Sequence, residues 1–197
     1  SAWHDEIFNS TPSPQAEEIY AGTMKEVMSG KASPLYPREH WDKIYGKGKW
    51  RGVIRFGIWQ GDKFRCIDDG KRSLHNLGQE IWEKIHHCVP DFAGLVAVYI
   101  SANLPDKVPD WAQLELGTDD LQDAYRGCPT SENSAQWSVV LVYDTSDNTW
   151  KGADIYGHSY GFRSSVNNFN AWPELVVAFG RRAMRIMTSH YVDDFPT

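Results

Sequence analysis

The sequence contains no apolar run long enough to cross a bilayer. The longest nearly unbroken one extends from Phe92 to Ile100, far short of the roughly 20 residues that a transmembrane helix needs. Cysteine is also scarce, and the three present, Cys66, Cys88 and Cys128, are odd in number and widely separated. This pattern disfavours both a disulfide framework and a four-cysteine zinc site. We therefore expect an intracellular protein, cytoplasmic or nuclear, that has no membrane partner.

Motifs of several common enzyme classes are missing as well. No Gly-x-Ser-x-Gly elbow marks a hydrolase nucleophile, and the Gly-Lys-Gly-Lys run at 46–49 lacks the glycine spacing of a phosphate-binding loop. The neighbours His86, His87 and Cys88 would point in different directions on a helix, and no second pair of ligands accompanies them. These absences disfavour a P-loop nucleotidase and a zinc enzyme.

Positive charge is in deficit overall but is unevenly distributed. The formal net charge is −6, which by itself disfavours contact with nucleic acid phosphates. Residues 20–72, however, carry a net charge of +6, whereas residues 1–19 carry −4 and residues 73–197 carry −8. Such a division suits a chain whose basic part grips phosphates and whose acidic part holds metal ions, although ordinary surface scatter would also produce it.

The remaining pattern is that of a globular chain of mixed α and β structure, with 41% apolar and 13% aromatic residues. Capping and spacing signals predict helices from about Ser13 to Gly30, over 77–88, and over 164–187 with a kink or split at Pro173. Two β-hairpins are expected, one joining 53–60 to 63–68 around Gly61-Asp62 and one joining 139–143 to 150–156. In the first hairpin, Arg55, Lys63 and Arg65 would project from one mobile, basic ribbon.

Two acidic segments offer ligands for divalent metal ions. Asp120 ends a short expected strand that turns at Leu121, and Asp193 and Asp194 lie in an expected strand, turn and strand. Three carboxylates and the Leu121 carbonyl could hold two Mg²⁺ ions, or Mn²⁺, because hard cations prefer oxygen ligands. One ion would activate a primer 3′ hydroxyl and the other would neutralise the triphosphate and the leaving pyrophosphate. Taken singly, each motif fits an ordinary turn or helix cap.

Four sequence blocks follow one another in an order that is more specific than any one of them. They are Lys63-Phe64-Arg65-Cys66-Ile67-Asp68-Asp69 with Asn76 after it, Asp120-Leu121-Gln122-Asp123-Ala124-Tyr125 with Pro129 after it, Tyr160-Gly161-Phe162-Arg163-Ser164-Ser165 with Phe169 after it, and Tyr191-Val192-Asp193-Asp194-Phe195. In this order they resemble the fingers block and three palm blocks of the reverse transcriptase family. The resemblance spans roughly Arg55 to the end of the sequence.

The resemblance implies an α+β fold with a polymerase palm, built from an antiparallel sheet and packed helices, and a fingers subdomain. Fingers would comprise about 20–76 and 130–157, and palm about 77–129 and 158–197. The sequence ends two residues after Phe195, so the resemblance implies that the thumb is absent and that a longer polyprotein supplies the remainder. We expect weak or undetectable polymerisation from these residues alone, because holding a duplex needs a large basic surface.

The resemblance also assigns the metal-binding side chains. Asp120, Asp193 and Asp194 would form the catalytic triad, with Asp120 and Asp193 as the principal metal ligands and Leu121 contributing its carbonyl. The activity implied is RNA-directed DNA synthesis on an RNA or DNA template with a primer, using deoxynucleoside triphosphates. The enzyme would be a nucleotidyltransferase of a retrotransposon or similar retroelement.

Nucleotide contacts are implied in the same way. Arg65 would pair with the triphosphate through its planar fork, with Lys63 as a weaker candidate. Asp123 and Tyr125 match positions that border the nucleotide, and the ring of Tyr125 would exclude a ribose 2′ hydroxyl. Gly161 would let the backbone approach the base pair closely. A solvated strand residue at Arg65 and a core tyrosine at 125 are the structural alternatives.

Two departures from the family pattern point to a divergent lineage. Ser165 and Val166 stand where the family often has a small residue and proline, and the run 170–173, Asn-Ala-Trp-Pro, is unusual. Three functions therefore stay open. These are a reverse transcriptase, an inactive retroelement remnant that still binds nucleic acid, and a polymerase of the same palm architecture that makes RNA, which Tyr125 disfavours.

Overall fold

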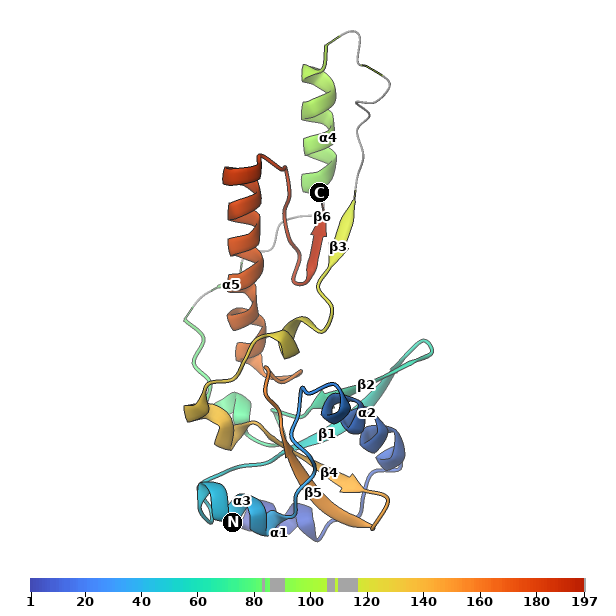
Figure 1. Cartoon of the computed structure of the whole chain (residues 1–197), viewed down its shortest axis with the longest axis vertical. Helices are drawn as coiled ribbons and strands as arrows, with labels where there is room; N and C mark the ends of the chain where they lie inside the picture. Colours follow the sequence, from blue (N-terminus) through green and yellow to red (C-terminus); the bar gives the residue numbers. More distant parts are fainter. Residues whose placement is uncertain (83, 86–90, 106–108, 110–116, 197) are drawn as a thin grey trace. The chain divides into compact units, whose positions relative to one another are not determined.

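The structure is a computed structural model that describes residues 1–82, 84–85, 91–105, 109 and 117–196. Helices and strands are both present, so the expected α+β class is confirmed (Figure 1). The α-helices are α1 (Ala2–Phe8), α2 (Ala16–Met28), α3 (Arg38–Tyr45), α4 (Asp91–Asn103) and α5 (Arg163–Phe179). The strands are β1 (Val53–Gln60), β2 (Lys63–Asp68), β3 (Thr118–Asp120), β4 (Val139–Asp144), β5 (Thr149–Asp154) and β6 (Asp194–Pro196). Short 3-10 turns are η1 (His75–Leu77), η2 (Ala124–Gly127) and η3 (Glu132–Trp137), and η4 (Gly180–Met184) is a π-helical turn.

The chain divides into two compact units, each assembled from two stretches of sequence. The first unit comprises Ser1–Ile81 and Tyr125–Ser165, and the second comprises Trp82–Ala124 and Val166–Thr197. Compared with the expected fingers boundaries, the first unit also takes in residues 1–19, 77–81, 125–129 and 158–165. Whether these units act as fingers and palm stays a prediction.

The first unit is built on a four-stranded sheet in the order β2-β1-β4-β5. Both expected hairpins are confirmed, with β1 antiparallel to β2 and β4 antiparallel to β5. Gly61, at φ +57°, makes the two-residue turn of the first hairpin possible. The sheet is mixed, because β1 and β4 pair in parallel through Val53 opposite Val140 and Ile54 opposite Leu141, a pairing that the sequence did not predict. A hairpin carries its turn signal in the sequence, whereas a parallel pair between distant segments carries none.

The sequence of β4 is apolar from Val139 to Val142 because both faces of this strand are buried. Val139 and Leu141 point into a core that contains Ile7 of α1 and Trp41 of α3. The alternate residues Val140 and Val142 point into a second core on the opposite face, together with Ile19 of α2 and with Ala32, Ala153 and Ile155. Side chains alternate along a strand, so a strand covered on both faces requires apolar residues at every position.

The predicted helices have mixed outcomes. The helix expected from Ser13 to Gly30 is confirmed as α2, which ends just before Gly30 at φ +73°. The helix expected over 77–88 is wrong for 78–82 and 84–85, which are not helical, and its other positions 83 and 86–88 lie outside the described residues. The apolar run from Phe92 forms α4 instead, beginning at Asp91 directly after Pro90.

Pro173 lies inside α5 and does not split it. A proline removes one backbone N–H and so breaks one hydrogen bond, but its side chain here is fully buried, and this burial offsets part of that loss. The helical expectation over 164–187 is therefore confirmed as α5, followed by η4 to Met184. Within the described ranges no helix combines the length and apolarity needed to span a membrane.

His4, which is buried, and Asp154, which is half-buried, should make the stability of the first unit depend on pH in opposite directions. Burial lowers the pKa of His4 to about 4, and its Nε2 accepts the Gly52 N–H at 3.2 Å. Its contribution to stability is complete above its unfolded pKa of about 6.5 and is lost as the pH falls toward 4. Burial raises the pKa of Asp154 to about 6, so its contribution is lost as the pH rises through that value.

We therefore expect two substitutions to change the pH dependence of the free energy of unfolding in opposite directions between pH 6.5 and 4.5. Replacing His4 with Gln should make the protein more stable on acidification relative to the wild type, and replacing Asp154 with Asn should make it less stable. Each change should amount to about 1–2 kcal/mol over this range. Urea unfolding at several pH values measures this, with the slope compared within each variant. Parallel slopes for all three proteins would contradict both assignments.

Candidate nucleotide and metal site

The acidic pair near the end of the chain lies on a tight turn in the second unit. Tyr191 and Asp194 form a two-way backbone bridge, with Tyr191 N–H donating to the Asp194 carbonyl at 2.9 Å and Asp194 N–H donating to the Tyr191 carbonyl at 3.1 Å. Val192 and Asp193 form the tip, and Val192 adopts the left-handed φ of +57° that a tight turn requires. The expected turn at this motif is thus confirmed, with Asp193 at its tip and Asp194 at the start of β6.

The turn is joined to the strand that carries Asp120. β3 and β6 are antiparallel, with Thr118 opposite Pro196, Asp119 opposite Phe195 and Asp120 opposite Asp194 (Figure 1). The Leu121 N–H extends this pairing by donating to the Asp193 carbonyl at 3.0 Å. Residues directly opposite each other project from the same face of a ladder, with Cβ atoms about 4.5–5.5 Å apart. The fold thus brings together two acidic segments separated by more than 70 residues of sequence.

This arrangement fits a Mg²⁺ ion. Two like charges directly opposite on a ladder repel each other, and a divalent cation between Asp120 and Asp194 would remove that repulsion. Among the described residues no three His, Cys, Asp or Glu side chains gather closely enough to hold a metal ion. Mg²⁺ does not need such a cage, since it is commonly held by one or two carboxylates, with water and substrate phosphates completing its shell. The roles of the Asp193 side chain and the Leu121 carbonyl stay predictions.

The predicted triphosphate contacts lie on the β1–β2 hairpin in the first unit. Ile58 is opposite Arg65, and Gln60 is opposite Lys63. Because alternate residues share a face, Lys63, Arg65 and Ile67 lie on one face of the hairpin. Both basic side chains are exposed, so they are accessible to an anionic ligand.

The expectation that Arg55 projects from the same ribbon is wrong. Arg55 is opposite Asp68 on the other face of the hairpin, and its side chain is fully buried against α2. Burial alone would lower the pKa of Arg55, but the adjacent carboxylates of Asp68 and Glu26 raise it. Arg55 is therefore a permanently charged structural residue rather than a contact for phosphate.

Gly161 lies against β2 on the face that carries Arg65. A Cβ at Gly161 would stand 2.3 Å from the Asp68 carbonyl oxygen and 3.3 Å from Cγ2 of Ile67, and its φ is +103°. Only glycine meets both conditions. Asn76 fixes this segment, because its side-chain amide donates to the Gly161 carbonyl at 3.1 Å and its Oδ1 accepts the Arg163 N–H at 3.0 Å. The structure thus joins the segment that ends at Asn76 to the segment 160–165 around one exposed glycine.

Tyr125 reaches the same part of the first unit. Its ring packs edge-on against Tyr160, the neighbour of Gly161, with centroids 5.6 Å apart. The Tyr125 carbonyl accepts the His158 N–H at 2.9 Å, and the Asp68 N–H donates to the Tyr160 carbonyl at 2.8 Å. Tyr125 is half-buried and Gly161 is exposed, which suits residues that border a ligand.

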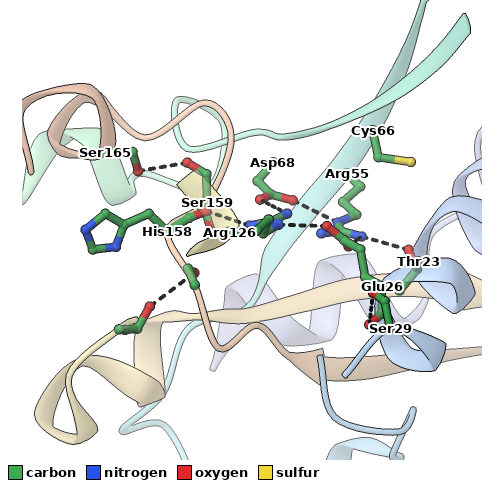
Figure 2. Close-up of polar contacts among 12 residues, drawn as sticks. Thr23, Glu26, Ser29, Arg55, Cys66, Asp68, Arg126, His158, Ser159 and Ser165 are labelled. Atoms are coloured by element: carbon green, nitrogen blue, oxygen red, sulfur yellow. Dashed lines mark hydrogen bonds and ion pairs between the residues drawn. The ribbon is translucent and has the colours of Figure 1, made fainter. Parts of the chain in front are cut away.

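A ring of four charged residues, of which Arg55, Asp68 and Arg126 are buried, was not anticipated. Glu26, Arg55, Asp68 and Arg126 form a closed ring of ion pairs, called the ion-pair ring below (Figure 2). The positions 26, 55, 68 and 126 follow no period, and an isolated Arg or Asp is ordinarily a surface residue. The only available signals were that Asp68 belongs to the fingers block and that Arg126 directly follows Tyr125.

The predicted site residues therefore form two groups. Lys63, Arg65, Tyr125 and Gly161 belong to the first unit, and Asp120, Leu121, Asp123, Asp193 and Asp194 belong to the second. Within the second group Asp123 is exposed and has the left-handed φ of +53°. No protein-family model matches the chain, and a search of curated proteins gives no significant match.

Proposed function

We propose that the protein is a template-directed nucleotidyltransferase that makes DNA on an RNA or DNA template. The observation that carries this proposal is the pairing of β3 with β6, which sets Asp120 opposite Asp194 and bonds Leu121 to Asp193. Two carboxylates on adjacent strands can hold a divalent ion whose shell the substrate phosphates complete, as phosphoryl transfer uses it. The exposed Arg65 and Lys63 supply the positive charge that a triphosphate needs.

The proposed chemistry divides between metal ions and side chains. Bound Mg²⁺ would activate the primer hydroxyl and neutralise the developing charge on the triphosphate. Asp120 and Asp194 would hold the metal, with Asp193 adjacent at the turn tip. Arg65 would orient the triphosphate, Gly161 would admit the base pair, and the Tyr125 ring would exclude a 2′ hydroxyl. Mn²⁺ satisfies the same oxygen ligands and should substitute.

Single-nucleotide incorporation at protein excess tests the proposal. A short labelled primer on RNA and DNA templates is mixed with the protein, one complementary deoxynucleotide and Mg²⁺ or Mn²⁺. Protein excess and a single addition do not require a lasting grip on the duplex, so we expect slow extension by one nucleotide that a chelator abolishes, even though continued polymerisation by these residues should be weak or undetectable. Binding of primer-template without extension under every metal condition would instead favour the non-catalytic remnant.

Tyr125 provides the second test of the proposed function. Replacing it with Ala should raise ribonucleotide incorporation relative to deoxynucleotide incorporation by about tenfold to a hundredfold, since loss of one steric contact alters selectivity by about 1–3 kcal/mol. Replacing Tyr125 with Phe keeps the ring and should leave the ratio unchanged. If the wild type and the Tyr125→Ala variant discriminate equally, the Tyr125 ring does not exclude the 2′ hydroxyl. A wild-type preference for ribonucleotides would favour a polymerase that makes RNA.

A further inference from the structure

The ion-pair ring is closed and alternates in sign. Asp68 Oδ1 lies 2.8 Å from Arg55 Nε, and Asp68 Oδ2 lies 3.0 Å from Arg126 Nη2. Glu26 completes the ring, with Oε2 at 2.6 Å from Arg55 Nη1 and Oε1 at 2.7 Å from Arg126 Nε. Each carboxylate thus bridges both arginines, and the charges sum to zero (Figure 2).

Burial makes the ring sensitive to small displacements. The side chains of Arg55 and Asp68 are fully buried, Arg126 is 2% exposed and Glu26 is 18% exposed. Burial alone would raise the pKa of Asp68, but the charges of Arg55 and Arg126 hold it below its ordinary value. Buried ion pairs add little net stability over well-packed apolar residues, because desolvation offsets the attraction between the charges. Their orientation is nevertheless strict, since every partner needs its hydrogen bonds.

Arg126 links the ion-pair ring to the Tyr160 and Tyr125 rings, which border the proposed nucleotide position. Its Nη1 donates to the His158 carbonyl at 2.8 Å, and its guanidinium stacks over the Tyr160 ring at 4.7 Å from the centroid. The Tyr160 ring in turn supports the Tyr125 ring. The backbone is equally close, because a Cβ at Gly157 would stand 2.3 Å from the Arg126 carbonyl oxygen. One guanidinium therefore contacts Glu26, Asp68, His158 and Tyr160 at the same time.

Arg55 is the second arginine of the ion-pair ring and the matched control for Arg126. It contacts Asp68, Glu26 and the hydroxyl of Thr23, which accepts from Arg55 Nη1 at 2.9 Å. The partners of Arg55 described here are these three residues, and neither Tyr125 nor Tyr160 is among them. Each arginine therefore forms ion pairs with both carboxylates of the ring, but Arg126 also contacts the Tyr160 ring.

We propose that Arg126 is a positioning residue for sugar selection, which orients the Tyr160 and Tyr125 rings by anchoring them to the ion-pair ring. This inference rests on the proposed function, since it concerns the residue that excludes the 2′ hydroxyl. Asp68 also ends the strand that carries Arg65, so the ring ties the proposed triphosphate contact and the sugar gate to one rigid support. A displacement of about 1 Å at such a support can change rates up to about a hundredfold.

The test compares Arg126→Lys with Arg55→Lys in the full chain. Lysine keeps the charge but cannot serve several acceptors in fixed directions or stack as a plane. Both variants should lower the thermal midpoint by similar amounts. Only Arg126→Lys should reduce the discrimination between a deoxynucleotide and its ribonucleotide, by about tenfold, with the effect in KM for the ribonucleotide rather than in kcat for the deoxynucleotide. Equal discrimination in the two variants would overturn the inference.

A second pair of variants covers the case in which Arg126→Lys does not fold. Tyr160→Leu removes the ring that Arg126 supports and leaves the ion-pair ring intact, so discrimination should fall, whereas Tyr160→Phe should retain it. Retained discrimination in Tyr160→Leu would overturn the positioning role while leaving the proposed polymerase in place. A wild-type protein that incorporates nothing would overturn the proposed function itself, and that result is visible before any variant is compared.

Discussion

Replacing Asp120 with Asn should lower nucleotide incorporation by about a thousandfold or more, because losing a metal ligand removes several kcal/mol of transition-state stabilisation. The fold should survive the change. Asp120 is exposed and opposite Asp194, so an amide at this position removes a like-charge pair from the ladder. In metal-free buffer the variant should therefore unfold at the same temperature as the wild type or slightly higher.

Asp119 provides the matched control for this prediction. It is adjacent to Asp120 on β3 and is equally exposed, but it is opposite Phe195 and projects from the other face of the ladder. Asp119→Asn should retain incorporation. Similar losses in the two variants would mean that general negative charge matters rather than the face, and full activity in Asp120→Asn would remove the proposed metal ligand.

Replacing Asp68 with Asn should be the most destabilising single change among the polar residues of the ion-pair ring. Asp68 bridges Arg55 and Arg126 with no exposure to solvent, so the amide would leave the two arginines facing Glu26 alone. Breaking a buried ion pair by removing one partner typically lowers the free energy of unfolding by about 3–5 kcal/mol. Urea unfolding at pH 7 measures the loss.

Asp62 is the control for that experiment. It is exposed at the turn of the same hairpin, where Asn is well tolerated, so Asp62→Asn should change the free energy of unfolding by less than about 0.5 kcal/mol. An Asp68→Asn variant as stable as Asp62→Asn would show that the ion-pair ring does not organise the first unit.

The parts of the fold that could be predicted from sequence are those with local signals. The turn at Gly61-Asp62 identified one hairpin, and the strand, turn and strand expected around Asp193-Asp194 included the turn on which this pair lies. The parallel pairing of β1 with β4 could not be inferred, because Val53 and Val140 meet only through tertiary packing. The helix expected over 77–88 also failed at the described positions 78–82 and 84–85, because tertiary context can override local helix propensity.

The candidate site shows the same division between local and distant information. Motif order alone indicated Asp120, Asp194, Arg65 and Gly161, and the structure sets Asp120 against Asp194 and Gly161 on the face of Arg65. Sequence favoured Asp193 as the main partner of Asp120, whereas the strand register sets Asp194 opposite it. Arg126 could not be selected, because its significance depends on Glu26 and Asp68, which are brought to it by separate elements.

Metal-directed cleavage of the backbone tests most directly whether Asp120 and the Asp193-Asp194 turn share one metal ion. Fe²⁺ bound in place of Mg²⁺ produces hydroxyl radicals with ascorbate and peroxide, and these cut the chain close to the ion. We expect cuts near residues 118–122 and 191–195 in the wild type and in Asp119→Asn, and loss of both in Asp120→Asn. Cleavage at only one of the two segments, or an unchanged pattern in Asp120→Asn, would contradict the shared metal site.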